Sequence, residues 1–247
     1  MSGAVGTTPP GAQGEQEAAR WVRGMFGSVA HRYDLLNHLL SLNIDRHWRR
    51  RTVKLVRPVL LQPGARVLDL CCGTGDLLIA LERAAGRPLL GGDFCHPMLV
   101  EAGRKLTAGS LRSSLIEADA LTLPFPDASL DLITAAFGFR NLANYRKGLA
   151  ELRRVLRPGG VAAILEFSQP RIPGFAAMYR LYSGRVLPFI GGLISGDRSA
   201  YTYLPESVRK FPGPEELARQ MTEAGFSSVQ FERMTGGVVA LHIGIAA

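Results

Sequence analysis

The stretch from Val67 to Asp76 places the strongest constraint on how this chain can fold. It begins with an apolar run, Val67 to Leu70, of the kind that forms a strand buried on both faces. Two glycines, Gly73 and Gly75, then break the run, and an apolar helical pattern follows from Leu77. Strand, glycine loop and helix form the first unit of a doubly wound α/β sheet, in which ligands bind where the strands end.

The same loop restricts the kind of ligand. Gly73 and Gly75 lack a Cβ, so their backbone can approach a ligand closely and adopt positive φ. A dinucleotide fingerprint would need a third glycine where Leu78 stands, and a carboxylate on Asp76 at the helix start would repel a pyrophosphate. A phosphate-free ligand fits better, and Asp69 with Asp76 suggests that it carries positive charge. The alternative is a tight strand-to-helix turn without a ligand.

Length and composition fit a single globular domain. The chain has 247 residues, of which 47% are hydrophobic and 20% charged, enough to bury one α/β core. Its apolar runs fall short of the roughly 18–20 residues needed to span a bilayer. Residues 1–17 are rich in Gly, Pro and Gln and lack the apolar segment of a secretion signal. We therefore expect a disordered tail over residues 1–17 and one domain over residues 18–247.

Charge and cysteine content narrow the partners and the compartment. The formal net charge of +8 indicates an anionic partner, which can be nucleic acid, anionic lipid or an acidic substrate. The three cysteines, Cys71, Cys72 and Cys95, are odd in number and gather near the predicted ligand edge. This pattern favours a reducing cytosol over a disulfide framework. The sequence contains no CxxC or HxxxH pair, so we expect no metal site.

Two helical segments are expected before the glycine loop. Helical periodicity begins near Glu15 and runs into a leucine-rich stretch at residues 34–42. A basic helix follows at residues 45–57, and Pro58 should end it. The leucine face either packs in the core or covers an apolar ligand above the strand ends.

Carboxylates end the second and third predicted strands. The strand at residues 89–93 ends in Asp93, roughly 20 residues after the glycine loop, the offset at which an acidic side chain reaches ribose hydroxyls. The strand at residues 115–119 ends in Asp119, which can accept a hydrogen bond from an adenine amino group beside the Ala120 N–H. Together these residues predict a nucleoside site at one edge of the sheet.

The remaining segments complete the expected sheet. We expect strands at residues 130–137 and 161–167, a final hairpin at 228–234 and 238–246, and helices at 97–105, 144–156 and 214–225. Pro158-Gly159-Gly160 should close the helix at 144–156. Residues 169–205 are too many for an ordinary connection, so we expect an insertion of short helices over the active site. The fold class is therefore α/β: a doubly wound, mostly parallel seven-stranded sheet with a terminal antiparallel hairpin.

Longer segments carry a more specific resemblance. They are Tyr33-Asp34-Leu35-Leu36-Asn37 with Ser41 and Trp48, Phe137-Gly138-Phe139-Arg140-Asn141, and Arg154 to Gly160 with Glu166-Phe167-Ser168. The first and last of these segments resemble the two signatures of the C-methyltransferases of menaquinone and ubiquinone biosynthesis. The middle segment resembles a third segment of the same family. The glycine loop resembles motif I of class I S-adenosylmethionine (SAM) methyltransferases. The match runs from about Phe26 to the C-terminus. This chain departs from the family at three positions: Leu36, where the family commonly has Met; Asp45, where it commonly has His; and Ala136, where it often has serine.

The resemblance implies a Rossmann-like, SAM-dependent methyltransferase that acts on a ring carbon of a prenylated quinol. We favour demethylmenaquinol as the substrate, which would give menaquinol; a ubiquinone precursor is the alternative within the family. By position, the family's cofactor contacts fall on Thr74, Asp93, Asp119 and Ala120. The loop and the strand ends add the further cofactor contacts that we expect, which are Asp69, Gly73, Gly75 and Phe94.

Catalysis then requires alignment of the methyl group with a ring carbon and activation of that carbon. Alignment can lower the activation free energy by about 7–11 kcal/mol. A base that weakens a quinol O–H bond can raise the rate by about 10²–10⁴-fold. Because a guanidinium stays protonated, Arg140 is expected to join Asn141 in holding the developing quinolate oxygen rather than to act as the base. Tyr33 and Asp34 are expected to position the ring or relay a proton, and His38 is a weaker base candidate.

A prenyl tail needs an apolar channel or an exit to lipid. We expect the leucine-rich helix and the segment from Phe175 to Phe189 to provide it. The basic residues from Arg46 to Arg57 form either a solvated face or a contact with anionic headgroups, worth about 1 kcal/mol per basic residue. We therefore expect a cytoplasmic enzyme that can rest on the inner face of the cell membrane, and a homodimer stays open.

Two rival functions belong to other classes. The basic charge is also compatible with an RNA methyltransferase, but the chain has no appended RNA-binding module and no Asn-Pro-Pro-Tyr base pocket, so we expect no nucleic-acid partner. The other rival is a SAM-binding scaffold without catalysis. The intact glycine loop, both strand-end carboxylates and Arg140-Asn141 argue against it.

Overall fold

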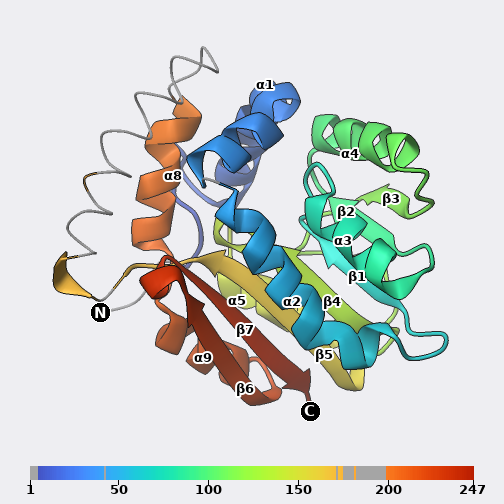
Figure 1. Cartoon of the computed structure of the whole chain (residues 1–247). Helices are drawn as coiled ribbons and strands as arrows, with labels where there is room; N and C mark the ends of the chain where they lie inside the picture. Colours follow the sequence, from blue (N-terminus) through green and yellow to red (C-terminus); the bar gives the residue numbers. More distant parts are fainter. Residues whose placement is uncertain (1–4, 42, 171, 175–180, 182–198) are drawn as a thin grey trace.

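The computed structural model describes residues 5–41, 43–170, 172–174, 181 and 199–247, with side chains for all of these except 32–40 and 199–202. Its centre is a seven-stranded sheet with the strand order β3-β2-β1-β4-β5-β7-β6 (Figure 1). The strands are β1 (Val67–Leu70), β2 (Leu90–Asp93), β3 (Ser114–Glu117), β4 (Leu130–Ala136), β5 (Leu156–Phe167), β6 (Phe226–Met234) and β7 (Val239–Ala246). Strands β1 to β5 run parallel, and β7 lies antiparallel between β5 and β6. The expected sheet and terminal hairpin are confirmed.

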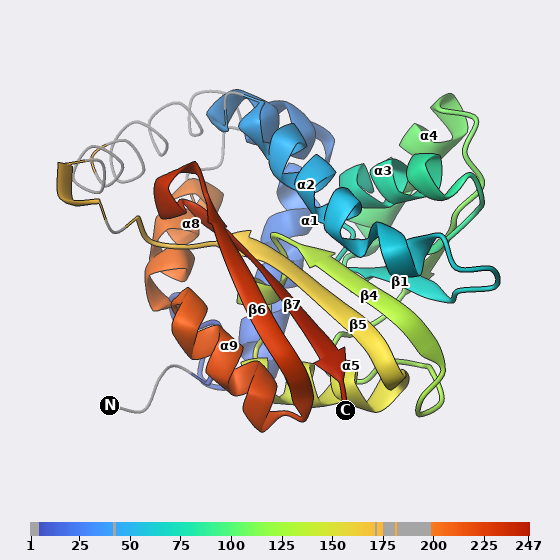
Figure 2. The same ribbon diagram turned by 60° about the horizontal axis from the view of Figure 1, so that its bottom comes forward.

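Helices cover both faces of this sheet. Those that the structure describes are α1 (Glu15–Leu40), α2 (Ile44–Leu60), α3 (Asp76–Ala85), α4 (His96–Ala108), α5 (Tyr145–Val155), α8 (Ser199–Lys210) and α9 (Pro214–Glu223), with 3-10 turns η1 (Phe139–Asn141) and η3 (Thr235–Gly237). Side chains of α2 and α3 share one core with the sheet, and side chains of α5 and α9 share the other. Figure 2 shows α2 and α3 on one side of the sheet and α9 on the other.

The central strands are apolar at successive positions because both of their faces are covered. On β4, Leu132 belongs to the core beside α2 and α3, and its neighbour Ile133 belongs to the core beside α5 and α9. Side chains alternate between the two faces of a strand, and these two are 0% and 1% exposed. Continuous apolar runs were therefore a sound basis for predicting the strands.

The proline in α2 does not end that helix as expected. The helix continues past Pro58 to Leu60. Pro58 removes one backbone hydrogen bond, but the last turn buries Val56 and Leu60 at 1% and 0% exposure. Packing of these two side chains offsets the lost hydrogen bond, so the prediction of a helix end at Pro58 was wrong.

The segment from Pro158 to Gly160 also differs from the expectation, because it lies inside β5 rather than between a helix and a strand. Leu156 pairs with Leu130 before this segment, and Val161 pairs with Leu132 after it. Four residues on β5 thus lie opposite one on β4 between these two pairs, and the register shifts there. The sequence Pro-Gly-Gly forms an irregularity within a long strand.

The N-terminal segment is more ordered than the tail expected for residues 1–17. Helix α1 already begins at Glu15. Ahead of it, the Thr7 N–H donates to the Leu142 carbonyl at 2.8 Å, and the Tyr145 N–H donates to the Val5 carbonyl at 2.8 Å. Composition predicted disorder, but these two backbone hydrogen bonds attach residues 5–7 to the loop before α5.

The expected insertion at residues 169–205 falls mostly outside the described residues. Its described end is the first part of α8, which confirms helical structure there. The aromatic positions from Phe175 to Phe189, proposed for a prenyl channel, lie outside the description. Of the leucine-rich stretch, the backbone of residues 34–40 belongs to α1, and the side chains of these residues lie outside the description.

Candidate active site

A cavity lies where β1, β2 and β4 end, at the edge of the sheet where ligands bind in doubly wound folds. Its empty volume is about 930 Å³, open solvent at its mouth included. Its walls come from the loop after β1, from the residues after β2, β3 and β4, and from α1 and α2. On α1, the side chains of Ala19 and Phe26 close it from above the strand ends.

The glycine loop after β1 forms the floor of this cavity. Gly73 and Thr74 line the floor, and Gly73 has a positive φ of 55°. Gly75, with φ at 86°, precedes α3, and a Cβ there would lie 3.3 Å from the Cβ of Ala102 on α4. Gly73 therefore allows backbone beside the cavity, whereas Gly75 allows close packing of α3 against α4.

Asp93 is held rigidly at the end of β2. Its Oδ2 accepts the Gly73 N–H at 2.9 Å, and its Oδ1 accepts the Cys95 N–H at 2.9 Å. The side chain lines the cavity, and the residue is only 6% exposed. Phe94 follows it in the wall, with the Arg23 guanidinium 5.3 Å from the ring centroid. This carboxylate is thus ready to accept hydrogen bonds from a ligand in a fixed geometry.

Asp69 and Asp119 line the same cavity in very different environments. Asp69 is buried in β1, where its Oδ1 accepts the Thr134 hydroxyl at 2.6 Å and its Oδ2 has no hydrogen-bond partner among the described residues. Asp119 is exposed, beyond the end of β3, and its Oδ1 accepts the Leu121 N–H at 2.9 Å. Ala120 lies beside it in the wall. The structure therefore brings together all the expected cofactor residues except Gly75, which supports the wall from behind.

The position of Asp76 in the sequence suggested a partner for a cationic ligand, but its carboxylate already pairs with cations of the protein. Its carboxylate pairs with Lys105 Nζ at 2.5 Å and with Arg49 Nη2 at 3.5 Å. Arg49 in turn pairs with Asp45, and its guanidinium lies 5.4 Å from the Phe137 ring centroid. Arg49 lines the cavity and was not identified from the sequence, because it stands in a basic run that is typical of a solvated face.

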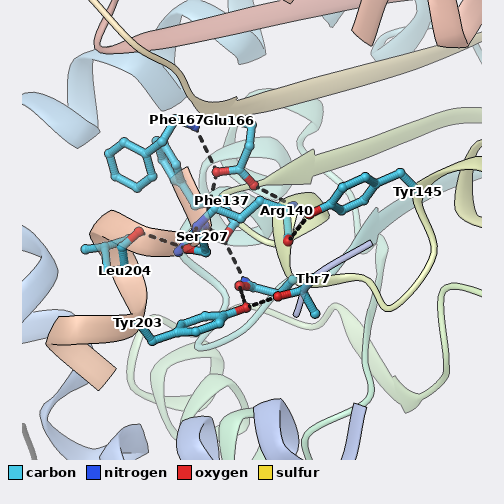
Figure 3. A network of polar contacts seen from close by, with 10 residues as sticks. Thr7, Phe137, Arg140, Tyr145, Glu166, Phe167, Tyr203, Leu204 and Ser207 are labelled. Atoms are coloured by element: carbon cyan, nitrogen blue, oxygen red, sulfur yellow. Dashed lines mark hydrogen bonds and ion pairs between the residues drawn. The ribbon is translucent and has the colours of Figure 1, made fainter. Parts of the chain in front are cut away.

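Of the Arg140-Asn141 pair, Asn141 faces the cavity and Arg140 lies in the protein interior. Both residues belong to η1, at the end of β4, and Asn141 lines the cavity. Arg140 is 4% exposed and pairs with buried Glu166 at 3.0 Å (Figure 3). Its Nη1 also donates to the Phe137 carbonyl and its Nε to the Ser207 hydroxyl at 3.3 Å. Arg140 is thus a support behind the wall, and the expectation that its guanidinium contacts a substrate oxygen does not fit this geometry.

The other two expected catalytic residues, Tyr33 and Asp34, lie on α1, the helix that covers the cavity. Their side chains are outside the description, as is that of His38. Gly138 was missed by sequence reasoning, although it stands in the Phe-Gly-Phe-Arg-Asn segment. A Cβ on Gly138 would lie 2.3 Å from the Cβ of Cys71, so only glycine lets the loops after β1 and β4 meet.

Comparison with known proteins agrees with this geometry. A model of the ubiE/COQ5 methyltransferase family matches residues 13–246. The chain belongs to this family. A demethylmenaquinone methyltransferase of Thermus thermophilus is 54% identical over 221 residues, which cover 89% of this chain and 99% of the relative. One of Deinococcus radiodurans is 48% identical over 231 residues, or 93% and 94% of the two chains.

Solved structures with low sequence identity share the fold of this ubiE/COQ5 family member. The [4+2]-cyclase SpnF superposes with a TM-score of 0.70 at 17% identity over 99% of both chains. A SAM-dependent methyltransferase from Aquifex aeolicus gives a TM-score of 0.58 at 20% identity over 79% of this chain and 89% of its own. Family membership makes the chain an enzyme, and SAM is its methyl donor.

The residues present fit SAM. SAM carries a ribose diol, which donates hydrogen bonds, and Asp93 offers a rigid carboxylate. It carries an ammonium and a sulfonium, and Asp69 offers a buried oxygen that has no partner within the described part of the chain. It has no phosphate, and the one Arg or Lys among the described residues that line the cavity, Arg49, is already paired with carboxylates.

The cavity carboxylates predict a pH-dependent affinity for the demethylated cofactor S-adenosylhomocysteine. Burial raises the pKa of Asp69 to about 7 and that of Asp93 to about 6. Both groups are therefore protonated in the free enzyme at pH 5, whereas a ligand with an ammonium and a diol binds their ionised forms. Affinity should rise by up to about tenfold per pH unit for each group between pH 5 and its pKa, and level off above pH 7.

Calorimetry with S-adenosylhomocysteine at several pH values would measure this effect. In two buffers that differ in ionisation enthalpy, binding near pH 6 should release protons. An affinity that stays constant from pH 5 to pH 8, with no proton release, would contradict a contact between these carboxylates and the ligand.

Proposed function

We propose that this enzyme transfers the methyl group of SAM to a ring carbon of demethylmenaquinol and so produces menaquinol in menaquinone biosynthesis. The observation that carries the proposal is the 54% identity to a demethylmenaquinone methyltransferase of which the alignment covers 99%. An apolar wall in the cavity supports an aromatic substrate. Phe137 lines the cavity with a ring centroid 4.7 Å from that of Phe167 and 5.9 Å from that of Trp48.

Each cofactor residue has a role that follows from its surroundings. Asp93 would accept the ribose hydroxyls, and Asp119 with the Ala120 N–H would hold the adenine edge. Gly73 and Thr74 would give the methionine portion a close backbone approach, with Phe94 against the base. Asp69 would face the positive charge of the cofactor, and Arg49 on α2, paired with Asp45 and Asp76, would hold this wall of the cavity in place. The bound cofactor supplies an activated methyl group on a sulfonium.

The residues on the substrate side of the cavity activate and position the quinol. Asn141 is in the wall and can donate a hydrogen bond to a quinol oxygen, which stabilises the negative charge that develops when the O–H proton leaves. Arg140 holds the η1 turn in place through Glu166 and the Phe137 carbonyl. We propose that Tyr33 and Asp34, on the covering helix α1, position the ring or relay its proton. Exclusion of water by α1 strengthens these contacts.

A substrate comparison tests the proposed function. The enzyme is incubated with labelled SAM and reduced short-chain demethylmenaquinol, with a reduced ubiquinone precursor, or with transfer RNA. We expect methyl incorporation into demethylmenaquinol at a rate at least tenfold above that of the ubiquinone precursor, and none into RNA. Faster methylation of the ubiquinone precursor would change the substrate within the family, and no transfer to either quinol would favour a scaffold.

We also propose that the enzyme works at the anionic face of the cell membrane, where a prenylated quinol resides. None of the described helices is long and apolar enough to span a bilayer. Helix α2 exposes a row of cations on one side, at positions roughly one turn apart: Arg46, Arg50, Lys54 and Arg57. Leu55 and Leu61 are 37% and 44% exposed near this row. A row of cations with apolar neighbours suits anionic headgroups.

Vesicle flotation tests this membrane contact. The double charge reversal Arg50→Glu with Lys54→Glu should weaken binding to phosphatidylglycerol vesicles by about 10–100-fold at low salt, since each basic residue contributes about 1 kcal/mol. Arg146→Glu with Arg219→Glu is the matched control, because α5 and α9 lie on the opposite face of the sheet. Equal losses in the two variants, or binding that high salt leaves unchanged, would remove the proposal.

A further inference from the structure

Helix α8 carries two polar side chains that face the Arg140-Asn141 pair. Tyr203 and Ser207 are one helical turn apart, and both are 4% exposed. The Tyr203 hydroxyl lies 3.0 Å from Asn141 Oδ1, and the Ser207 hydroxyl accepts from Arg140 Nε. Figure 3 shows both side chains pointing from α8 toward this turn. Buried polar groups of this kind are expected to hold a defined arrangement.

The contact with Tyr203 determines the orientation of the Asn141 amide, with Oδ1 toward Tyr203 and Nδ2 away from it. Burial raises the pKa of the Tyr203 hydroxyl, so it is protonated and donates to Oδ1. The amide nitrogen of Asn141 then lies 3.5 Å from the Phe137 carbonyl, which can take one of its two hydrogens. The second hydrogen remains for the cavity that Asn141 lines. A flipped amide would instead place its oxygen toward the Phe137 carbonyl and the cavity, and two acceptors would repel each other.

The N-terminal segment completes the arrangement. Thr7 Oγ1 lies 2.6 Å from the Tyr203 hydroxyl (Figure 3). Because Tyr203 donates its one hydrogen to Asn141, Thr7 must donate to Tyr203. The Tyr203 ring is fixed against Trp21 of α1, with centroids 5.1 Å apart. A chain of hydrogen bonds thus runs from Thr7 through Tyr203 to Asn141, and each member has one possible direction.

We propose that Tyr203 is a positioning residue that keeps the N–H side of the Asn141 amide toward the substrate oxygen, and that Thr7 holds Tyr203 in that role. The inference rests on the proposed function, since the oxygen concerned is that of the quinol. Without the Tyr203 hydroxyl the buried Asn141 Oδ1 loses its donor, so the amide leaves this orientation for most of the time, presents an acceptor to the developing anion, and turnover slows. The loss of one such donor lowers turnover by about 10²–10³-fold when it is complete.

A set of variants of the full chain tests the proposal. Tyr203→Phe keeps the ring against Trp21 and removes only the hydroxyl; we expect kcat with reduced short-chain demethylmenaquinol to fall at least tenfold. The Kd for S-adenosylhomocysteine should stay within twofold. Thr7→Val should lower kcat by about threefold to tenfold. Thr8→Val is the matched control, because Thr8 is exposed and has no place in the chain of hydrogen bonds, and its kcat should not change.

The decisive readout is non-additivity with Asn141. If Tyr203 acts through Asn141, then Tyr203→Phe and Thr7→Val will lower kcat in the native background but will not lower it further in the Asn141→Ala background. Independent losses in both backgrounds, or an unchanged kcat in Tyr203→Phe, would overturn the proposal. Thr7→Val provides the same test if Tyr203→Phe does not fold. An unmodified enzyme that is inactive on the quinol would instead refute the proposed function.

Discussion

Replacement of Arg140 by methionine is expected to lower the free energy of unfolding by about 3–5 kcal/mol, because it leaves the Glu166 carboxylate buried without its cation. Arg140 and Glu166 have side chains that are 5% and 1% exposed, so water cannot take the place of the guanidinium. Urea denaturation at pH 7 would measure this loss. Arg219→Met is the control: its partner Glu216 is at the surface, and the expected loss is below about 1 kcal/mol.

The same pair allows stability and catalysis to be separated. Glu166→Gln alone should destabilise the enzyme, yet when added to Arg140→Met it should restore part of the stability, because it removes the unpaired buried charge. Turnover should stay low in the double variant, because the guanidinium contacts with the Phe137 carbonyl and Ser207, which support the η1 turn that carries Asn141, are still missing. Recovery of turnover together with stability would mean that Arg140 supports the fold and has no part in catalysis.

The second large effect is expected at Asp93. Asp93→Asn should weaken binding of S-adenosylhomocysteine by about 10²–10⁴-fold. Hydrogen bonds to a charged group contribute about 1.5–3 kcal/mol each, and the two from the ribose hydroxyls to Asp93 are lost or weakened. The amide cannot accept at both ends, while Gly73 and Cys95 each donate to a different oxygen. One end of the asparagine therefore faces a backbone N–H as a second donor.

Asp119→Asn is the matched comparison for this prediction. Asp119 is exposed and makes its backbone hydrogen bond through one oxygen, so we expect a loss of about tenfold or less. Calorimetry on both variants gives the ranking. Equal losses at Asp93 and Asp119 would show that burial and rigidity at β2 do not determine cofactor affinity.

The sequence was most informative where one physical requirement dominated. The buried strands could be predicted because Leu132 and Ile133 must both be apolar when helices cover both faces of the sheet. The position of Gly73 and Asp93 at one cavity could be predicted because the carboxyl ends of parallel strands meet at the same edge of the sheet. These features depend on neighbours within a few residues or on the regular geometry of a parallel sheet.

The sequence was least informative where distant segments decide the outcome. Pro58 lies within α2 because tertiary packing of Leu60 outweighs a local preference. Arg49 was interpreted as a surface cation because its partner Asp76 is on another helix. The role of Tyr203 depends on Thr7, 196 positions away. No local pattern records such a contact, so the support behind Asn141 could be found only from the structure.

The central claim is methylation at carbon, with the quinol oxygen held by a donor in the cavity wall. Single-turnover transfer from SAM with a trideuterated methyl group to reduced short-chain demethylmenaquinol, followed by fragmentation of the product in a mass spectrometer, tests it most directly. We predict one trideuteromethyl group on the quinone ring carbon and both oxygens free. A trideuteromethyl ether, or no labelled product from enzyme that binds S-adenosylhomocysteine, would contradict the account.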